Sequence, residues 1–547
     1  MSTTELNLPS DVDQLHVLVA KLHKEKGENE SEIRYLNERI KQLTHQLYGR
    51  KSEKLLLDDN FEQSSLFDDS GVSDESEPAS VDEIITVPSH KRKKKGGRKI
   101  LSENLPCVEV EHDIKESEKL CACGCWMSRI GQEVSERLEM LPARFWVERH
   151  IRLKYACKHC EGVERNEGER SVKIAPVPVQ LLPKTISSPS LLSHVFVGKF
   201  CDSLPFYRQE KQFLRLGFSI TRATMCNWAT KVADKCQPIL DLLRQEILSG
   251  PLINIDESWF QVLKEEGRSP ESNSFMWVYR GGRPDKIAVI YRYNKSRSGV
   301  EAKKFLGDYR GNVQTDGFSG YNFLDTQEGI VHAGCWAHVR RKFLEVAGSR
   351  NVKNKQNLSG LGKAGKAIQY IRELYAIEKN ARLKNLSPDL LREARQQKSK
   401  PILDEFKDWL TEKGPQIPPK SLLGKAFIYT QSQWHRLVKY LEDGNIGMDN
   451  NLAENAVRPF VVGRKNWLFS DTTDGAKANA AIYSLIETAK SKGLEPYRYF
   501  CYLFDKLPVA QDEGQLKALL PMNLTDDDLE LHQKEYLEKA NRAVKKI

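Results

Sequence analysis

The chain has 547 residues, of which 39% are hydrophobic and 29% charged, with a formal net charge of +9 and 11 cysteines. This length exceeds what one hydrophobic core can organise, so we expect three or four folded units. No apolar run reaches the roughly 18 residues of a membrane span and no secretory leader is recognisable, which excludes a membrane or secreted protein and favours the cytoplasm. In that reducing compartment, clustered cysteines indicate metal ligands rather than disulfides.

Residues 1–57 carry apolar side chains at three- and four-residue spacings, which predict a long amphipathic helix. The spacing runs through Leu15, Leu18 and Leu22 and resumes at Ile33, with an interruption near Gly27. Glu and Lys fill most flanking positions, a pattern typical of a coiled coil with a stutter. We therefore expect a coiled-coil oligomerisation arm; an amphipathic helix packed on its own domain is the alternative.

Residues 58–104 have the composition of a linker. An acidic, serine-rich stretch (DDSGVSDESEPASVDE) is followed by the basic run KRKKKGGRK at 91–99. Low hydrophobicity and dense charge cannot support a packed core, so we expect disorder here. The basic run has two interpretations, contact with DNA phosphates or a solvated tether.

Residues 105–175 contain two cysteine pairs, which predict a small zinc-binding module. The first pair lies in CACGC and the second in CKHC, and the four candidate ligands are Cys121, Cys123, Cys157 and Cys160. Four thiolates satisfy a tetrahedral structural Zn²⁺ and leave no position open for chemistry. Cys125 is an alternative member of the first pair, and buried free cysteines are the alternative to zinc.

Residues 176–250 are predicted to be helical and to contain a helix-turn-helix. In LPFYRQEKQFLRLGFSITRATMCNWATKVADK, Gly217 suits the turn and Ser219 or Thr221 suits the cap of the second helix. Met225 and Trp228 would then face inward, and the side chains placed to meet DNA would be Arg222, Asn227 and Lys231. An ordinary helix pair without DNA contact is the alternative.

Residues 251–492 are predicted to form a mixed α/β core. Three strand-like runs (LINIDESWFQVL, FMWVYRGG, KIAVIYRYN) follow one another closely, and alternating helices and short strands come next. This order matches a ribonuclease-H-like sheet. A helical insertion is expected at about 347–445, and 493–547 is expected to be a helical tail. The predicted fold is thus a multidomain α/β protein.

Three carboxylates in this core suggest divalent-metal chemistry on a polyanion. Asp256 lies within a predicted central strand, Asp316 at the carboxyl end of another, and Glu454 at an amide-rich helix start. Carboxylate oxygens are ligands for hard cations, and fixed positive charges nearby suit phosphates. The candidates for phosphate contact are Arg458, Arg464 and Lys465, and Trp467 is a candidate for stacking on a displaced base.

Each of these carboxylates has a competitor nearby. Glu257 adjoins Asp256 but belongs to the opposite strand face, and Asp308 precedes Asp316 in a loop-like segment. Asp449 precedes Glu454 and suits a helix cap. A further set, His332, Cys335 and His338, looks like a second metal cluster, but we assign it structural roles because no fourth ligand is close in sequence.

Long motifs spread over nearly the whole chain resemble bacterial transposases of the insertion-sequence-66 family. They are LINIDESW, VQTDGFSGYNFL, HAGCWAHVRRKF, MDNNLAENAVRPFVVGRKNWLFSDT and SLIETAKSKGLEPYRYFCYLFDKLP, with GRKSEKL, CACGC…CKHC and LPFYRQ upstream. Two details depart from the family pattern: IDESWF replaces the threonine-bearing DET, and CACGC differs from the commoner zinc-module spacing. The resemblance implies an Asp-Asp-Glu triad, whose matching positions here are Asp256, Asp316 and Glu454.

The resemblance further implies two catalytic Mg²⁺ ions, terminal inverted repeats and target DNA as substrates, and accessory proteins from the same element. We expect hydrolysis at the element ends to free a 3′-hydroxyl, followed by direct transesterification into target DNA. A homo-oligomer in the bacterial cytoplasm, nucleoid-associated when bound to DNA, would perform it. Two alternatives are open: a catalytically inactive DNA-binding regulator derived from a transposase, and a different nuclease on the same fold, such as one that resolves junctions.

Overall fold

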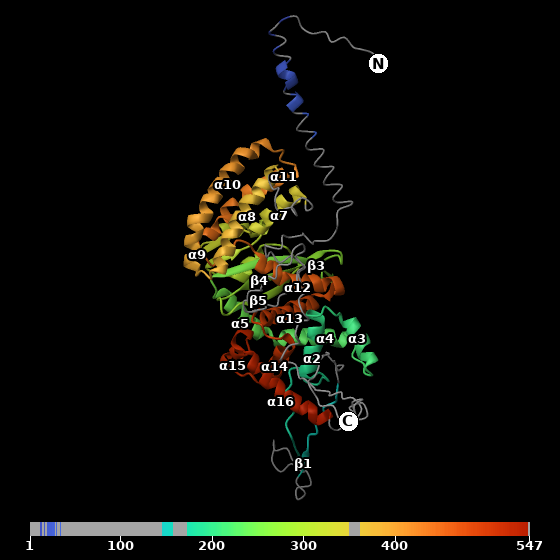
Figure 1. Ribbon diagram of the computed structural model, residues 1–547. Coiled ribbons are helices and arrows are strands. Elements are labelled where there is room, and N and C mark those ends of the chain that lie inside the picture. Colours follow the sequence, from blue (N-terminus) through green and yellow to red (C-terminus); the bar gives the residue numbers. More distant parts are fainter. Residues whose placement is uncertain are drawn as a thin grey trace, which may run out of the picture. The chain divides into compact units, whose positions relative to one another are not determined.

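The computed structural model describes residues 145–156, 172–348 and 362–544, with scattered positions between 11 and 33. The chain divides into two compact units, residues 70–175 and the remainder (Figure 1). From Asp13 onward the described N-terminal positions are helical, and Val19, Leu22 and Ile33 among them are exposed. The linker predicted at 58–104 and the zinc-ligand candidates Cys121, Cys123, Cys157 and Cys160 lie outside the described residues.

In the unit of residues 70–175, the described residues include a short antiparallel strand pair. Strand β1 (Lys154–Ala156) pairs with β2 (Val172–Ile174). The Arg152 Nε atom donates to the Ala175 carbonyl over 2.7 Å, which extends the pairing by one contact. The two cysteines of CKHC fall between these strands in the sequence.

Four helices precede the sheet: α2 (Pro189–Phe200), α3 (Phe206–Arg215), α4 (Arg222–Lys235) and α5 (Gln237–Leu248). Gly217, with a φ of 91°, makes the turn after α3 in the left-handed region that glycine tolerates. The Thr221 hydroxyl caps α4 by accepting from the Thr224 N–H at 3.2 Å. Met225 and Trp228 are buried, as predicted for their positions on α4, and the helix-turn-helix itself stays a prediction.

The sheet of the larger unit has six described strands, and the longest of them, β3 (Leu252–Lys264), is central. The strands on the antiparallel side are β4 (Asn273–Gly281) and β5 (Ala288–Asn294). After helix α6 (Val300–Leu306), the parallel strands are β6 (Gly311–Gln314) and β7 (Ile330–Ala333), giving the order β5-β4-β3-β6-β7.

Strand β3 has a gap in its pairing on the parallel side. β6 pairs with β3 at Leu252–Asn254, whereas β8 (Phe469–Thr472) pairs with it at Gln261–Lys264. Within the described chain, no strand pairs with the intervening stretch on that edge. Asp256 lies in this stretch. β4 pairs with it on the antiparallel side, but helices and loops rather than a strand form its surroundings on the parallel side.

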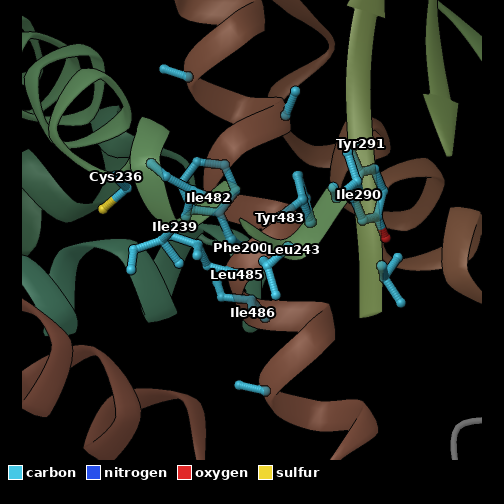
Figure 2. Packing of buried hydrophobic residues seen from close by; sticks show 14 of the residues in the cluster. Phe200, Cys236, Ile239, Leu243, Ile290, Tyr291, Ile482, Tyr483, Leu485 and Ile486 are labelled. Atoms are coloured by element: carbon cyan, nitrogen blue, oxygen red, sulfur yellow. The ribbon is translucent and has the colours of Figure 1, made fainter. Parts of the chain in front are cut away.

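Helix α12 (Asn451–Trp467) leads into β8, and α13 (Thr473–Ser491) follows as the most buried helix of the unit. The hydroxyls of Ser484 and Thr488 accept from the Tyr291 and Val289 N–H groups, at 2.8 and 3.0 Å. These bonds satisfy donors of edge strand β5, which an uncovered sheet edge would leave open to other chains. Figure 2 shows Ile482 and Tyr483 of α13 in the core with Phe200, Ile239 and Tyr291.

Helices fill most of the range predicted as an insertion. After α7 (Trp336–Ala347), they are α8 (Gly362–Leu383), α9 (Pro388–Ala394), α10 (Lys400–Lys413) and α11 (Leu422–Leu437). Their aromatic side chains form a second core, in which Trp336 packs against Phe406 and Trp434. The C-terminal helices are α14 (Pro496–Lys506), α15 (Glu513–Ala518) and α16 (Asp526–Val544). Among the described helices, none combines the length and apolarity of a membrane span.

Candidate active site

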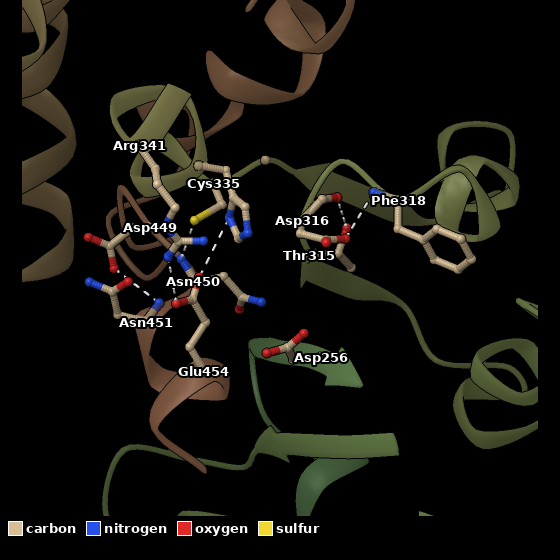
Figure 3. A network of polar contacts seen from close by, with 12 residues as sticks. Asp256, Thr315, Asp316, Phe318, Cys335, Arg341, Asp449, Asn450, Asn451 and Glu454 are labelled. Carbon is tan, nitrogen blue, oxygen red and sulfur yellow. Dashed lines mark hydrogen bonds and ion pairs between the residues drawn. The ribbon is translucent and has the colours of Figure 1, made fainter. Parts of the chain in front are cut away.

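Three carboxylates from separate elements converge beside the gap in the sheet. Asp256 comes from the middle of β3, Asp316 follows β6 by two residues, and Glu454 lies in the first turn of α12 (Figure 3). Burial raises the pKa of Asp256 well above its usual range, and the charges of Glu257, Glu454 and Asp316 raise it further. Asp256 is therefore surrounded by negative charge in a poorly hydrated place.

This electrostatic arrangement fits a divalent cation. Carboxylates that repel one another cost stability unless a cation or protons compensate them. The donors of Asp256, Asp316 and Glu454 are all oxygens, which are the ligands that Mg²⁺ prefers. The residues present thus suit the metal that the sequence predicts.

Local backbone hydrogen bonds orient two of the three carboxylates. Asp256 Oδ1 accepts from the Glu257 N–H at 2.9 Å, and Asp316 Oδ1 accepts from the Phe318 N–H at 2.9 Å. In the second case the aspartate forms a local turn with the loop that leaves β6. One oxygen of each side chain is held in this way, which limits the directions that the other can take.

A buried network of three amide side chains joins the elements that carry the carboxylates. Asn254 Nδ2 donates to Gln314 Oε1 at 3.1 Å and to Asn450 Oδ1 at 2.9 Å. Asn450 Nδ2 in turn donates to the Ile255 carbonyl at 2.8 Å, in the stretch of β3 that lacks a strand partner on the parallel side. All three amides are buried to 1% exposure or less. Asn254 and Gln314 stand two residues before Asp256 and Asp316, so each amide anchors an element just before its carboxylate.

Glu454 has a basic and sulfur-containing environment supplied by α7. Its Oε2 atom lies 3.2 Å from Arg341 Nη2, and its Oε1 atom lies 3.5 Å from His338 Nδ1. Cys335, which precedes α7, accepts a hydrogen bond at Sγ from the Asn450 N–H at 3.2 Å. The sequence offered no signal for Arg341 as a partner of Glu454, because only the packing of α7 beside α12 brings the two together.

The competing residues have other partners. Glu257 is ion-paired with Arg297 at 2.7 Å and hydrogen-bonded to Tyr321, while Asp308 is exposed beyond α6. Asp449 accepts from the Asn451 N–H at 3.1 Å and from the Tyr375 hydroxyl at 3.0 Å, as expected of a residue that fixes a helix start.

The histidine and cysteine set of the sequence analysis divides in two. His332 contacts Thr315 Oγ1 and Asp325 Oδ1, at 2.8 and 2.7 Å, whereas Cys335 and His338 lie close to Glu454. The structural role assigned to His332 agrees with its contacts. A further ligand was not expected beside this set, but Glu454, which is distant in the sequence, lies within 4.8 Å of the donor atoms of Cys335 and His338.

Comparison with known proteins gives the family. The model described as "Transposase IS66 family" matches residues 184–478, more than half of the chain. The chain belongs to the IS66 family of transposases. Further family models match residues 118–161 (zinc-finger binding domain of transposase IS66), 484–522 (IS66 C-terminal element) and 35–110 (Transposase C of IS166 homeodomain). The resemblance seen in the sequence is therefore confirmed.

Similar full-length proteins are found in Sinorhizobium fredii. The uncharacterized protein y4jD is 31% identical over 97% of this chain and 99% of its own length. The uncharacterized protein y4qI is 29% identical over 95% of this chain and 98% of its own length. The match thus covers nearly the whole length of both relatives.

The family match indicates a DNA-cutting and DNA-joining enzyme with a structural zinc. The zinc-finger match spans both cysteine pairs, including Cys125, so structural Zn²⁺ is supported in that segment. The transposase match spans Asp256, Asp316 and Glu454.

The basic residues of α12 differ in their exposure and in their contacts. Arg464 packs over the Trp259 ring at 4.3 Å and donates to Ser258 Oγ at 3.3 Å, two residues from Asp256. Lys465 is exposed and Arg458 is half-buried. Trp467, the candidate for base stacking, packs edge-to-face on Phe460 and is half-buried.

Trp259, which is 51% exposed, was not identified from the sequence. It lies three residues after Asp256 on β3, and its exposure could be found only from the structure. In the helix-turn-helix, the predicted DNA-contacting side chains Arg222, Asn227 and Lys231 are all exposed on α4.

Proposed function

We propose that this IS66-family protein is an Asp-Asp-Glu transposase that frees a 3′-hydroxyl at the element ends and joins it to target DNA. The observation that carries the proposal is the convergence of Asp316 and Glu454 on Asp256 (Figure 3). Burial raises the pKa of Asp256, and the charges of Glu257, Glu454 and Asp316 raise it further. Asp256, Asp316 and Glu454 would together hold two Mg²⁺ ions, which would supply Lewis-acid chemistry at the reacting phosphate. In a core without metal-dependent chemistry, the repulsion among these carboxylates would lower stability without serving a function.

We further propose that the core is ribonuclease-H-like. The support is the order β5-β4-β3-β6-β7, with β3 to β5 antiparallel and β6 and β7 parallel to β3. In this arrangement Asp256 occupies the central strand and Asp316 follows the adjacent parallel strand. The helical group α8–α11 enters between the second and third carboxylates of the sequence.

The proposed chemistry has two in-line displacements at phosphorus. In the first, a water oxygen attacks the phosphodiester at the element end, and the bond to the 3′-oxygen breaks and leaves a 3′-hydroxyl. In the second, that hydroxyl attacks a target phosphate, forming one phosphodiester bond as another breaks. The Mg²⁺ ions, when bound, would lower the pKa of the attacking oxygen and stabilise the leaving one.

The residues of the chain orient this site. Asp256 and Asp316 each have one oxygen fixed by a backbone N–H, so the other is directed toward the shared space. The amides Asn254, Gln314 and Asn450 keep β3, β6 and α12 in register. No covalent link between protein and DNA is required in this scheme.

DNA contacts are proposed on two surfaces. Near the carboxylates, Arg464 and Lys465 would neutralise backbone phosphates together with Arg458, and Trp259 offers an exposed ring for stacking. The stacking role of Trp467 stays a prediction, although its ring is the less exposed of the two. On α4, Arg222, Asn227 and Lys231 would contact the terminal inverted repeats.

The proposal has three further parts. The protein oligomerises through the N-terminal arm, and accessory proteins from the same element assist it. Structural zinc is held by Cys121, Cys123, Cys157 and Cys160. Two active sites brought together by paired element ends would cut and join both ends in one complex. A basic chain of net charge +9 is suited to holding several DNA segments at once.

The test is cleavage and strand transfer on labelled DNA that carries the terminal repeats of the flanking element, comparing wild type with Glu454→Gln. We expect Mg²⁺-dependent products from the wild type and a loss of about 10³-fold in the variant, roughly 4 kcal/mol of transition-state stabilisation. Glu301→Gln is the matched control, because Glu301 also occupies the first turn of a helix, α6.

DNA binding should be unchanged in both variants. Equal cleavage by Glu454→Gln and wild type would contradict the triad. A wild type that binds the repeats and yields no product, even with the element's other proteins added, would instead favour the inactive regulator.

A further inference from the structure

A second set of possible metal donors lies beside the acidic cluster. Cys335 Sγ, His338 Nδ1 and Glu454 Oε1 all lie within 4.8 Å of one another. Cys335 and His338 are three residues apart at the start of α7, so one helical turn presents both to the first turn of α12. Figure 3 shows Cys335 and Glu454 pointing toward the same space.

Two of these three donor atoms make no hydrogen bond with the described part of the protein. His338 Nδ1 and Glu454 Oε1 form an ion pair at 3.5 Å, which is too long for a good hydrogen bond, and neither of these buried atoms makes a hydrogen bond among the described residues. Arg341 contacts the other oxygen of Glu454, Oε2, at 3.2 Å. Buried polar atoms are nearly always satisfied in proteins, so two that face each other call for a third group.

Cys335 completes this environment with a sulfur. It is 2% exposed and forms no disulfide, and its Sγ accepts from the Asn450 N–H at 3.2 Å. Donation of a backbone N–H to sulfur is the type of surrounding contact that supports a thiolate bound to a metal.

We propose that Cys335, His338 and Glu454 form a binding site for a soft divalent cation, Zn²⁺, distinct from the predicted cysteine module. Sulfur, imidazole nitrogen and carboxylate oxygen together are typical ligands of Zn²⁺, whereas Mg²⁺ selects oxygen alone. Binding would release the thiol proton to solvent, and neutral His338 would coordinate through Nδ1. Three protein ligands leave one position open to water or to a phosphate oxygen.

The proposed zinc site would share Glu454 with the catalytic cluster. This part of the inference rests on the proposed function. Glu454 would be held by Zn²⁺ through Oε1 on the side of α7, and only Oε2, which Arg341 contacts at 3.2 Å, would remain to face the catalytic cluster. The Glu454 carboxylate would then contact both a tightly bound Zn²⁺ and the exchangeable Mg²⁺ ions. Zinc binding itself requires no DNA cleavage, so its measurement fails or succeeds independently of the transposase activity.

The experiment measures zinc per full-length chain by mass spectrometry of the metal, after equilibration with Zn²⁺ and removal of the excess. The variants are Cys335→Ala and His338→Gln, and the matched control is Cys236→Ala, another buried cysteine without a disulfide. We expect both site variants to contain one zinc fewer than wild type, and the control to equal wild type. The predicted cysteine module contributes the same amount to every protein, so the difference isolates this site.

His338→Gln tests the site should Cys335→Ala fold poorly, because His338 is partly exposed. Equal zinc in wild type and His338→Gln would overturn the proposal. Excess Mg²⁺ should not reduce the zinc content of the wild type, since Mg²⁺ binds thiolate weakly. Displacement of this one equivalent by Mg²⁺ would contradict the sulfur ligand and hence the site.

Discussion

Asn254 Nδ2 donates to Asn450 Oδ1 over 2.9 Å and so links the central strand to the residue that precedes α12. The bond joins positions 196 residues apart in the sequence, with the helical insertion between them. It is buried, and a buried amide without its partner costs about 1–3 kcal/mol. The distance between Asp256 and Glu454 is thus maintained by a network that is stable only when every member is present.

The first prediction concerns Gln314, which ties β6 to this network. Its Nε2 atom donates to the Gly334 and Gly447 carbonyls, at 3.0 and 2.7 Å. In Gln314→Leu, the Asn254 amide and two carbonyls lose partners, so we expect a loss of a few kcal/mol in stability. Because Asp316 follows two residues later, the Mg²⁺ concentration for half-maximal cleavage should also rise, by about tenfold.

Gln209→Leu is the matched control for this effect. Gln209 is likewise buried, and its Nε2 donates to two carbonyls, those of Val195 and Leu204, both at 3.0 Å. It should lower the melting temperature comparably and leave the Mg²⁺ dependence of cleavage as in wild type. Equal Mg²⁺ dependence in all three proteins would reduce Gln314 to a purely structural role.

The second prediction follows from the raised pKa of Asp256. The folded chain binds this proton more tightly than the unfolded chain, so without metal its stability falls as pH rises above about 4, the unfolded value. Asp256→Asn removes that penalty. The metal-free variant should melt at a higher temperature than wild type at neutral pH, with a difference that shrinks toward pH 4, and should have lost cleavage.

Calorimetric scans of the metal-free proteins at several pH values measure this effect. Added Mg²⁺ should stabilise the wild type more than Asp256→Asn. The exposed Asp308→Asn is the control and should match wild type in both respects. A variant that melts below wild type at neutral pH would show that repulsion at Asp256 is not the dominant effect.

The sequence was sufficient to place the carboxylates on their elements because strands and helices have fixed periods. Alternation along β3 separates Asp256 from Glu257, and the structure gives Glu257 its own cation, Arg297. The helix cap at Thr221 and the turn at Gly217 were likewise predictable, because each depends on the chemistry of one residue. These are local effects, and local effects are readable without a structure.

The surroundings of the carboxylates were not predictable in this way. Arg341 and His338 contact Glu454 only because α7 and α12 pack together, and no periodicity encodes that packing. The amide network did leave a signal: Asn254 and Gln314 are polar residues inside apolar strand runs, each two positions before a carboxylate. A polar side chain in a buried run requires partners, and here the partners are the other elements of the site.

The third prediction is a pH dependence of stability caused by His332. Burial lowers the pKa of His332 to about 4, below its ordinary value of 6.5, while its ring is held between Thr315 and Asp325. Between these values the unfolded chain binds more protons than the folded chain. The contribution of His332 to stability is therefore complete above pH 6.5 and is lost as pH falls toward 4.

Melting temperatures from pH 7 to pH 4 test this prediction. In His332→Asn, the free energy of unfolding should fall less steeply as the pH is lowered. The slope should decrease by the equivalent of up to one bound proton, which is about 1.4 kcal/mol per pH unit. His23→Asn, at an exposed position of the N-terminal helix, should keep the wild-type slope. An unchanged slope in His332→Asn would assign the acid sensitivity to other groups.

The last prediction separates two kinds of DNA contact on α4. Lys231 lies past the middle of the helix and is exposed, so we expect it to contact a phosphate. Lys231→Ala should weaken binding to all sequences similarly and reduce the slope of log affinity against log salt by about 1.

Asn227, nearer the helix start, would contact a base edge, so Asn227→Ala should instead cost about 1–3 kcal/mol of discrimination for the terminal repeat. Lys407→Ala on α10, also exposed, is the control and should change neither quantity. Equal salt slopes for Lys231→Ala and Lys407→Ala would remove α4 from the DNA interface, because a phosphate contact cannot be lost without its share of released counterions.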